Sequence, residues 1–297
     1  MCGIVGAIAE RNVTPILLEG LRRLEYRGYD SAGIVTLDSR DDRLHRVRTV
    51  GKVEALAGRL QQEAVRGPLG IAHTRWATHG EPCERNAHPH LSNDSVAVVH
   101  NGIIENYQEL KTKLSAAGYR FESDTDTEVV AHLIDQSLRK NGGDLLAAVR
   151  QAVSQLTGAY SLGVICREDP HRLIATRAGS PLVLGIGIEE HFIASDVFAL
   201  APVTQSFVFL EEGDVAEVRR DGFIIYDREG QPVERPLSYS GQMGSAAGKG
   251  GYRHFMLKEI FEQPGVVAET LEGRIHQGRL LEDSFGPDAG PLFEQVQ

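Results

Sequence analysis

Residues 2–9 read CGIVGAIA, an apolar run with glycine at two internal positions that directly follows the first methionine. Its length and its glycines predict a short buried strand that neighbouring segments can approach closely. The cysteine that begins the run has two interpretations. Free cysteine is among the most buried residue types, so Cys2 could be one more packed side chain. Removal of Met1 would instead leave a thiol and a free α-amine on the same residue.

The second interpretation gives Cys2 a chemical role. An α-amine has a pKa of about 7.7–8.0 and a thiol one of about 8.5, so the two groups can exchange a proton near neutral pH. An N-terminal residue whose own amine accepts the proton of its nucleophile is an established activation scheme. Positioned proton transfer contributes about 10²–10⁴ in rate. Taken alone, Cys2 is better explained by packing, because cysteine is so commonly buried.

Strands and helices are predicted on both sides of this run. The segment 13–28, VTPILLEGLRRLEYRG, has helical apolar spacing with Pro15 in its first turn. Thr125 and Glu128 have the spacing of a capping box. Further helices are predicted over 52–64, 104–117, 126–140 and 144–156, and strands over 32–37, 69–73, 95–100, 160–166, 172–176, 182–187, 206–210 and 214–219. Runs of strands and paired helices favour an α+β fold with layered antiparallel sheet.

The chain is expected to contain one large domain and the beginning of another. The first domain is placed at residues 2–240. Residues 241–252 are rich in glycine and are interpreted as a linker. Helical spacing resumes within 253–297, where Pro264 is expected to end one helix and begin the next.

Composition excludes several classes of function. The 297 residues include 31 basic and 41 acidic side chains, a net charge of −10, which disfavours partnership with nucleic acid or an anionic membrane. There is no apolar run of the ~20 residues that would span a bilayer and no secretory signal. The three cysteines, Cys2, Cys83 and Cys166, form no disulfide or zinc pattern, and they favour a reducing, cytoplasmic setting.

Asn101 and Gly102 stand at the end of an apolar run, in VVHNGIIEN. Asn-Gly between apolar runs is a strong hairpin signal, so a tight turn is the simpler interpretation. The alternative is an oxyanion hole, in which the asparagine amide and the glycine N–H donate to a developing negative charge. Such a donor is worth about 10²–10³ in turnover.

The segment 72–90, AHTRWATHGEPCERNAHPH, carries four histidines and a cysteine. Their spacing matches no zinc pattern, so no metal is expected. Arg75 could form a surface ion pair, or its guanidinium could hold a carboxylate in a bidentate fork. Trp76, the only tryptophan, could belong to the core or to a lid.

Asp126 is placed in the first turn of a helix, where the helix dipole favours a carboxylate. The same position would keep it ionised and able to receive an ammonium group. The segment GSAAGKGG, at 244–251, lacks the spacing of a phosphate-binding loop. Together, the thiol and amine, the Asn-Gly donors, the arginine and the aspartate describe a pocket for a free amino acid whose side-chain carbonyl is attacked. Glutamine fits, with acyl transfer as the reaction.

The chain resembles the class II, N-terminal-nucleophile glutamine amidotransferases, and more closely the family of isomerizing glutamine–fructose-6-phosphate aminotransferases. The resemblance rests on the motifs MCGIVG, LEYRGYDSAG, HTRWATHG, NAHPH, VVHNGIIEN, SDTDTEVVAHL and YRHFMLKEIFEQP. It implies an αββα sandwich of two antiparallel sheets between helical layers. It also implies a transferase of amino sugar biosynthesis without a cofactor.

The resemblance further implies the roles of the site residues. Cys2, freed of Met1, would form a γ-glutamyl thioester, with Asn101 and Gly102 as the oxyanion hole. The α-carboxylate of L-glutamine would be held by Arg75, Thr78 and His79. Its ammonium group would be received by Asp126 and the carbonyl of Gly102. Trp76 would lie near the ammonia exit, on a loop that closes over glutamine.

In that family two sugar isomerase domains follow the glutaminase, bind fructose 6-phosphate and supply most contacts of a homodimer. This sequence reaches only the beginning of that region, so the chain by itself is expected to be the glutaminase half. The alternatives are the glutaminase domain of another class II enzyme, such as amidophosphoribosyltransferase, and a glutamine-binding module without catalysis.

Overall fold

The structure is a computed structural model, which describes residues 2–38, 40–63, 65–239, 252–271, 275–276 and 279–280, together with Phe293. The chain divides into two compact units, Met1–Met243 and Gly244–Gln297. All the motifs that the sequence suggests for chemistry lie in the first unit.

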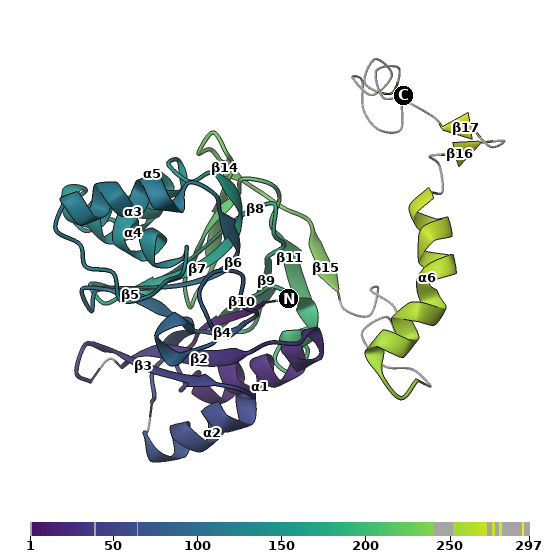
Figure 1. Ribbon diagram of the computed structural model, residues 1–297, viewed down its shortest axis with the longest axis horizontal. Helices are drawn as coiled ribbons and strands as arrows, with labels where there is room; N and C mark the ends of the chain where they lie inside the picture. The colour runs from purple at the N-terminus through teal and green to yellow at the C-terminus, as the bar shows by residue number, and fades with distance from the viewer. Residues whose placement is uncertain are drawn as a thin grey trace. The chain divides into compact units, whose positions relative to one another are not determined.

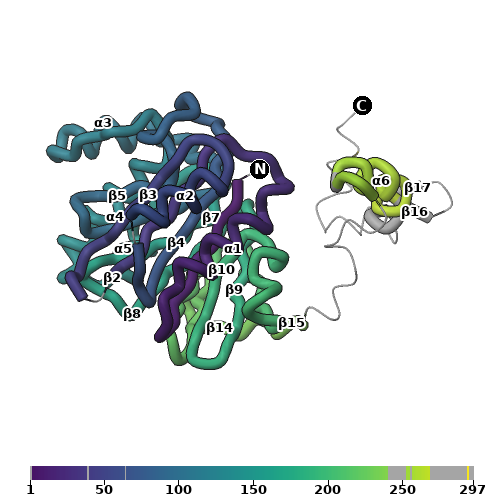
Figure 2. The backbone as a smooth tube through the Cα atoms, turned by 90° about the horizontal axis from the view of Figure 1, so that it is seen from below, coloured from purple at the N-terminus to yellow at the C-terminus, as the bar shows by residue number. Residues whose placement is uncertain are grey.

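The first unit contains an eight-stranded sheet with the order β15-β11-β9-β10-β1-β4-β2-β3. Its strands are β1 (Gly3–Ile8), β2 (Ser31–Asp38), β3 (Arg43–Val50), β4 (Leu69–Arg75), β9 (Val183–Ile186), β10 (His191–Ala194), β11 (Ser206–Phe209) and β15 (Leu237–Tyr239). The opening apolar run forms β1, which is buried along its whole length between β10 and β4 (Figure 2). Both pairings of β1 are antiparallel.

A seven-stranded sheet faces the first, with the order β14-β13-β12-β8-β7-β6-β5. Its strands are β5 (His90–Ser92), β6 (Val96–Ile104), β7 (Gly158–Cys166), β8 (Asp169–Ala178), β12 (Val215–Val218), β13 (Phe223–Tyr226) and β14 (Pro232–Val233). Apolar side chains of the two inner faces pack together, among them Ile4 and Ile71 from the first sheet and Val99 from the second. This buried layer joins the sheets into a sandwich.

Helices cover both outer faces of the sandwich (Figure 1). They are α1 (Thr14–Leu24), α2 (Val53–Gln62), α3 (Tyr107–Ala116), α4 (Glu128–Lys140) and α5 (Leu145–Val153), with the short 3₁₀ turns η1 (Glu25–Arg27), η2 (Glu84–Asn86) and η3 (Val197–Ala199). The apolar stripe of α1, including Leu17 and Leu21, packs on the first sheet, and that of α4, including Val130 and Ile134, packs on the second. The predicted αββα sandwich is confirmed.

The second unit contains the helix α6 (Phe255–Leu271) and a short strand pair, β16 (Ile275–His276) with β17 (Arg279–Leu280). The predicted helix break at Pro264 is wrong, because α6 runs through it. A proline inside a helix removes one hydrogen bond and its ring crowds the carbonyl four residues before it, which a helix can accommodate by a local kink rather than by ending. No helix in the described part of the chain has both the length and the apolar character that crossing a membrane requires. Most of the predicted linker, 241–251, lies outside the described residues.

Candidate active site

Cys2 lies directly before β1, which is a central strand of the first sheet. Glycine is required after it, because a Cβ at Gly3 would lie 2.7 Å from both Leu24 Cδ1 and Thr74 Oγ1. The Trp76 N–H lies 3.2 Å from Cys2 Sγ, and Sγ lies 3.5 Å from the Trp76 carbonyl. Burial raises the pKa of the Cys2 thiol, while the Trp76 N–H and the charge of Arg75 act in the opposite direction. The thiol is half-buried and reaches a cavity, so packing alone does not explain Cys2.

Asn101 and Gly102 come from the facing sheet. The hairpin-turn interpretation is wrong, because both residues lie inside β6 and pair with Ser161 and Tyr160 of β7. Gly102 has a φ of 126°, and a Cβ there would lie 2.0 Å from the Ala159 carbonyl oxygen. A larger residue could not occupy this position without displacing the strand. The side chain of Asn101 reaches across to the first sheet, where its Nδ2 donates to the Cys2 carbonyl at 3.3 Å.

Arg75 ends β4 and is 4% exposed. Its guanidinium donates to the carbonyls of His79 and Gly80, and it lies 3.6 Å from the Asp30 carboxylate. Asp30 also accepts a hydrogen bond from the Ala77 N–H. The segment 76–81 is therefore folded around the guanidinium, which holds the loop together from inside.

Asp126 was expected in the first turn of a helix, and this prediction is wrong, because α4 begins at Glu128. The capping-box prediction is also wrong. Glu128 accepts hydrogen bonds from the main-chain N–H groups of Glu122 and Ser123, and no side chain caps the helix. Asp126 lies in the turn before α4 and is 4% exposed. One of its oxygens accepts from the Ile104 N–H at 2.8 Å, and the other lies 3.9 Å from His79 Nδ1.

Two adjoining cavities bring the predicted residues together. We call the larger one the thiol cavity; it has a volume of about 630 Å³ and is lined by Cys2, Arg27, Trp76, Thr78, Asn101, Gly102, Ile103, Ser180, Pro181 and Ser195. We call the smaller one the polar subsite; it has a volume of about 10 Å³ and is lined by Cys2, Arg75, Trp76, Thr78, His79, His88, His100, Gly102, Thr125, Asp126 and Thr127. Every predicted site residue lines at least one of the two, and four of them line both: Cys2, Trp76, Thr78 and Gly102.

Sequence reasoning missed several residues of these cavities. Arg27 lies in the 3₁₀ turn η1 and Ser195 directly follows β10. Neither was singled out from the sequence, although Arg27 lies within the motif LEYRGYDSAG. Thr125 and Thr127 line the polar subsite, although the pattern around them was interpreted as a helix cap. Asp30, which fixes the loop after Arg75, was not singled out either.

Four histidines of the sequence motifs, His73, His88, His90 and His100, pack together beside the polar subsite, and His88 and His100 line it. The rings of His73 and His88 stack at 4.2 Å, and His90 and His100 lie beside His88. Their ring nitrogens contact polar side chains: His73 contacts Asn101, His88 and His100 contact Thr127, and His90 contacts Thr125. Burial lowers the pKa of all four, that of His73 to about 3.

This histidine cluster predicts a loss of stability in mild acid. A histidine in the unfolded chain has a pKa of about 6.5, whereas the folded-state values are lower. The unfolded state therefore binds more protons as the pH falls below 6.5. Each histidine that stays neutral then reduces the free energy of unfolding by about 1.4 kcal/mol per pH unit. Urea unfolding measured between pH 8 and pH 5 checks this, and a free energy independent of pH below 6.5 would contradict it.

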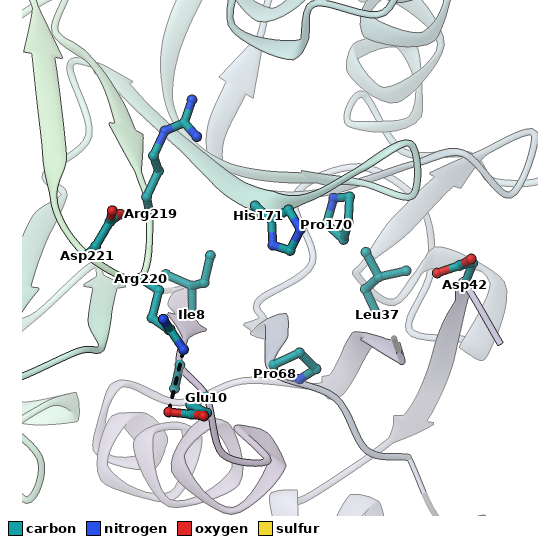
Figure 3. Close-up of a pocket in the computed structure, with 11 residues that line it drawn as sticks. Ile8, Glu10, Leu37, Asp42, Pro68, Pro170, His171, Arg219, Arg220 and Asp221 are labelled. Carbon is teal, nitrogen blue, oxygen red and sulfur yellow. Dashed lines mark ion pairs between the residues drawn. The ribbon is translucent and has the colours of Figure 1, made fainter. Parts of the chain in front are cut away.

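A third cavity, of about 710 Å³, lies at the opposite end of β1 from Cys2 and is lined in part by Ile8, Ala9 and Glu10 (Figure 3). Arg220 also lines this cavity, and its guanidinium nitrogens lie 3.4 Å from a carboxylate oxygen of Glu10 and 3.6 Å from one of Glu189. Among the residues that the structure describes, no cysteine, serine or threonine lines it. The chemistry that the sequence suggests is therefore concentrated at the other end of the sandwich.

Known proteins resemble this chain in sequence and in fold. A family model described as a glutamine amidotransferase domain matches residues 73–202. A solved structure of glutamine phosphoribosylpyrophosphate amidotransferase from B. subtilis has a TM-score of 0.62 and is 26% identical, covering 80% of this chain and 49% of that one. A structure of the allosteric regulatory enzyme of purine biosynthesis has a TM-score of 0.63 at the same identity and coverage. The chain is therefore similar in sequence and in fold to the glutamine amidotransferases, the class of protein that its sequence motifs suggest.

Within that class, the chain is similar along its whole length to glutamine–fructose-6-phosphate aminotransferases (isomerizing). It is 57% identical over 297 residues to the protein of Pseudomonas aeruginosa and 56% identical to that of Idiomarina loihiensis. Each match covers 100% of this chain and 48% of the relative. The chain thus spans about half the length of the curated relatives that it matches.

Proposed function

We propose that this chain hydrolyses L-glutamine to glutamate and ammonia, with Cys2, freed of Met1, as the nucleophile. The observation that carries the proposal is the convergence of Cys2, Asn101 and Gly102 on one cavity from two facing sheets. The polar subsite supports it, because Arg75 and Asp126 line a space that Cys2 and Gly102 also line. A cationic and an anionic group beside a thiol suit a free α-amino acid.

In the proposed reaction the free α-amine of Cys2 accepts the thiol proton, and Sγ attacks the side-chain carbonyl carbon of glutamine. The Asn101 amide and the Gly102 N–H donate to the oxygen as it becomes negative. The intermediate collapses to a γ-glutamyl thioester, and ammonia leaves with the proton that the amine returns. Water then attacks the thioester through a second oxyanion and releases glutamate.

The loop 76–81 would have to open before glutamine can bind. The polar subsite, at about 10 Å³, has room for about one water molecule. Three carbonyls of this loop, those of His79, Gly80 and Glu81, face the Arg75 guanidinium. A substrate carboxylate would compete for the same N–H donors. Opening the loop would free Arg75 for the α-carboxylate, and reclosing it would place Thr78 and His79 over the substrate.

Asp126→Asn is expected to raise the KM for glutamine by about 10–100-fold with a much smaller change in kcat. A charged hydrogen bond is worth about 1.5–3 kcal/mol, and the substitution removes the charge that would receive the substrate ammonium. The new amide can still accept from the Ile104 N–H, which bonds Asp126 now. Steady-state hydrolysis measured against Asp144→Asn, which changes an acid at the start of α5, checks this. An unchanged KM would exclude Asp126 from substrate binding.

In a longer protein like the relatives, we propose that the ammonia is used to convert fructose 6-phosphate to glucosamine 6-phosphate. The 57% identity to a glutamine–fructose-6-phosphate aminotransferase, against 26% to an amidophosphoribosyltransferase, favours this over the purine branch. Trp76 lines the thiol cavity and is 53% exposed, which supports its proposed role as a gate for ammonia. The fructose 6-phosphate site and the homodimer contacts would belong to the rest of such a protein. The free thiol of Cys2 supports a reducing, cytoplasmic setting.

The proposal is tested by turnover. Protein whose N-terminus is confirmed as Cys2 is incubated with L-glutamine, and glutamate and ammonia are measured together. Equal amounts of the two products are expected, because hydrolysis forms one of each. Saturable glutamine binding without turnover would replace this proposal with a glutamine-binding module.

A further inference from the structure

One buried side chain contacts Asn101, the proposed oxyanion donor, and has no role in the mechanism above. His73 lies on β4, where it pairs with Ile4 of β1 and Gly33 of β2, and it is 1% exposed. Its Nε2 lies 2.9 Å from Asn101 Oδ1, a hydrogen bond that joins the two sheets. Asn101 is thus held between two neighbours, His73 on one side and the Cys2 main chain on the other.

The chemistry of these two neighbours fixes the direction of the Asn101 amide. The Cys2 carbonyl can only accept a hydrogen bond, so the amide atom 3.3 Å from it must be the Nδ2 donor. The amide oxygen then faces His73. Because Oδ1 can only accept, the Nε2 of His73 must carry a proton. One carbonyl that cannot donate therefore determines both the amide orientation and the histidine tautomer.

The surroundings of His73 keep this arrangement in place. Burial lowers the pKa of His73 to about 3, so the ring is neutral and carries one proton at working pH. A main-chain hydrogen bond with His100 partly offsets this lowering of the pKa. Nδ1 has no partner in hydrogen-bond geometry among the described residues, whereas Nε2 lies 2.9 Å from Asn101 Oδ1. Nε2 is therefore the nitrogen at which the proton is stabilised. Stacking against His88, with 18° between the ring planes, limits rotation of the ring.

We propose that His73 is a positioning residue that holds the Asn101 amide so that Nδ2, with the N–H that the Cys2 carbonyl does not use, faces the oxyanion. This inference rests on the proposed glutaminase function. A flipped amide would present Oδ1 to the developing negative charge, which would repel it instead of stabilising it. His73 does not touch the substrate; it acts through Asn101.

A double-mutant cycle tests the proposal. His73→Leu removes the donor to Asn101 Oδ1. Its kcat for glutamine hydrolysis is expected to fall about tenfold or more, with a smaller change in KM. One oxyanion donor is worth roughly 10²–10³-fold in turnover, and loss of its positioning is expected to remove part of that factor. In the Asn101→Ala background the same substitution is expected to change kcat less than about twofold, because the group it positions is gone. Equal effects in both backgrounds would overturn the proposal.

A matched control separates positioning from loss of a buried histidine. His191 is also buried on the first sheet, and its Nδ1 contacts the Arg220 carbonyl at the opposite end of β1 from Cys2. His191→Leu is expected to leave kcat within about twofold of the unchanged protein, since its contacts are far from the thiol. If His191→Leu lowered kcat as much as His73→Leu, the effect of His73 would be structural and the proposal would fail.

The tautomer of His73 can be measured without any activity. In ¹⁵N-histidine-labelled protein, NMR is expected to show the His73 proton on Nε2 and none on Nδ1. A proton on Nδ1 would overturn the proposal even if His73→Leu failed to fold. The two failures remain distinguishable: absence of glutamine turnover in the unchanged protein removes the proposed function, whereas additive kinetics or the other tautomer removes only the role of His73.

Discussion

Cys2→Ala is expected to lower glutamine hydrolysis below detection while leaving the fold intact. Among the described residues, Cys2 provides the only thiol that lines the thiol cavity. Cys83 and Cys166 are not among the lining residues, so neither is placed to form the γ-glutamyl thioester there. The stability change is expected to be within about 1 kcal/mol, because the thiol is half-buried and makes only weak sulfur hydrogen bonds with Trp76. Measurement of product release together with urea unfolding checks both parts.

Cys83→Ala provides the matched control for the thiol. Cys83 is also half-buried and free, and it lines neither the thiol cavity nor the polar subsite. Cys83→Ala is expected to leave the rate of glutamine hydrolysis within a few-fold of that of the unchanged protein. Hydrolysis that survives Cys2→Ala would end the account of Cys2 as the nucleophile.

Asn101→Ala is expected to reduce kcat by about 10²–10³ with a much smaller effect on KM. The Asn101 amide would donate most strongly when the substrate oxygen carries negative charge, so its loss affects the transition state more than the bound substrate. The Gly102 N–H and the nucleophile remain, which is why the loss is expected to be incomplete. Single-turnover kinetics of thioester formation measures the effect directly.

Asn106→Ala is the control for this second substitution. Asn106 lies just before α3, and its side chain bonds the main chain of Gln155 and Thr157, away from both cavities. It is expected to leave kcat and KM nearly unchanged. A change in Asn101→Ala that is confined to KM would mean that Asn101 contributes only to binding or to the strand.

Much of the fold could be predicted from apolar periodicity. The predicted strand at 2–9 became β1, and the five predicted helices of the first unit all formed within a few residues of their expected bounds. The strands missed were β3 and several short strands such as β5 and β10. In β3, polar residues such as Arg46 and Arg48 alternate with Val47, and their pairing with β2 is set by tertiary contacts. A strand of three or four residues offers too few alternations to detect.

The residue types of the site were easier to predict than their local structure. Cys2, Arg75 and Asp126 were chosen for their chemistry, and the structure brings them to adjoining cavities. The wrong predictions concerned the conformation of the backbone. Asn101 and Gly102 continue a strand because they pair with β7. The Asn-Gly dipeptide is a local signal and carries no information about a pairing strand elsewhere in the sequence. The contact between His73 and Asn101 crosses two sheets, so no sequence spacing could reveal it.

The most direct test of the nucleophile is an intact-mass measurement after incubation with an electrophilic glutamine analogue. Protein that begins at Cys2 is expected to gain one adduct. Protein that retains Met1 is expected to gain none, because the nitrogen of Cys2 is then a peptide amide and cannot accept the thiol proton. Cys2→Ala is also expected to gain none. Peptide mapping should place the adduct on Cys2. Protein that begins at Cys2 and stays unmodified, or carries the adduct on Cys83 or Cys166, would contradict the claim that Cys2 is an activated thiol facing a glutamine pocket.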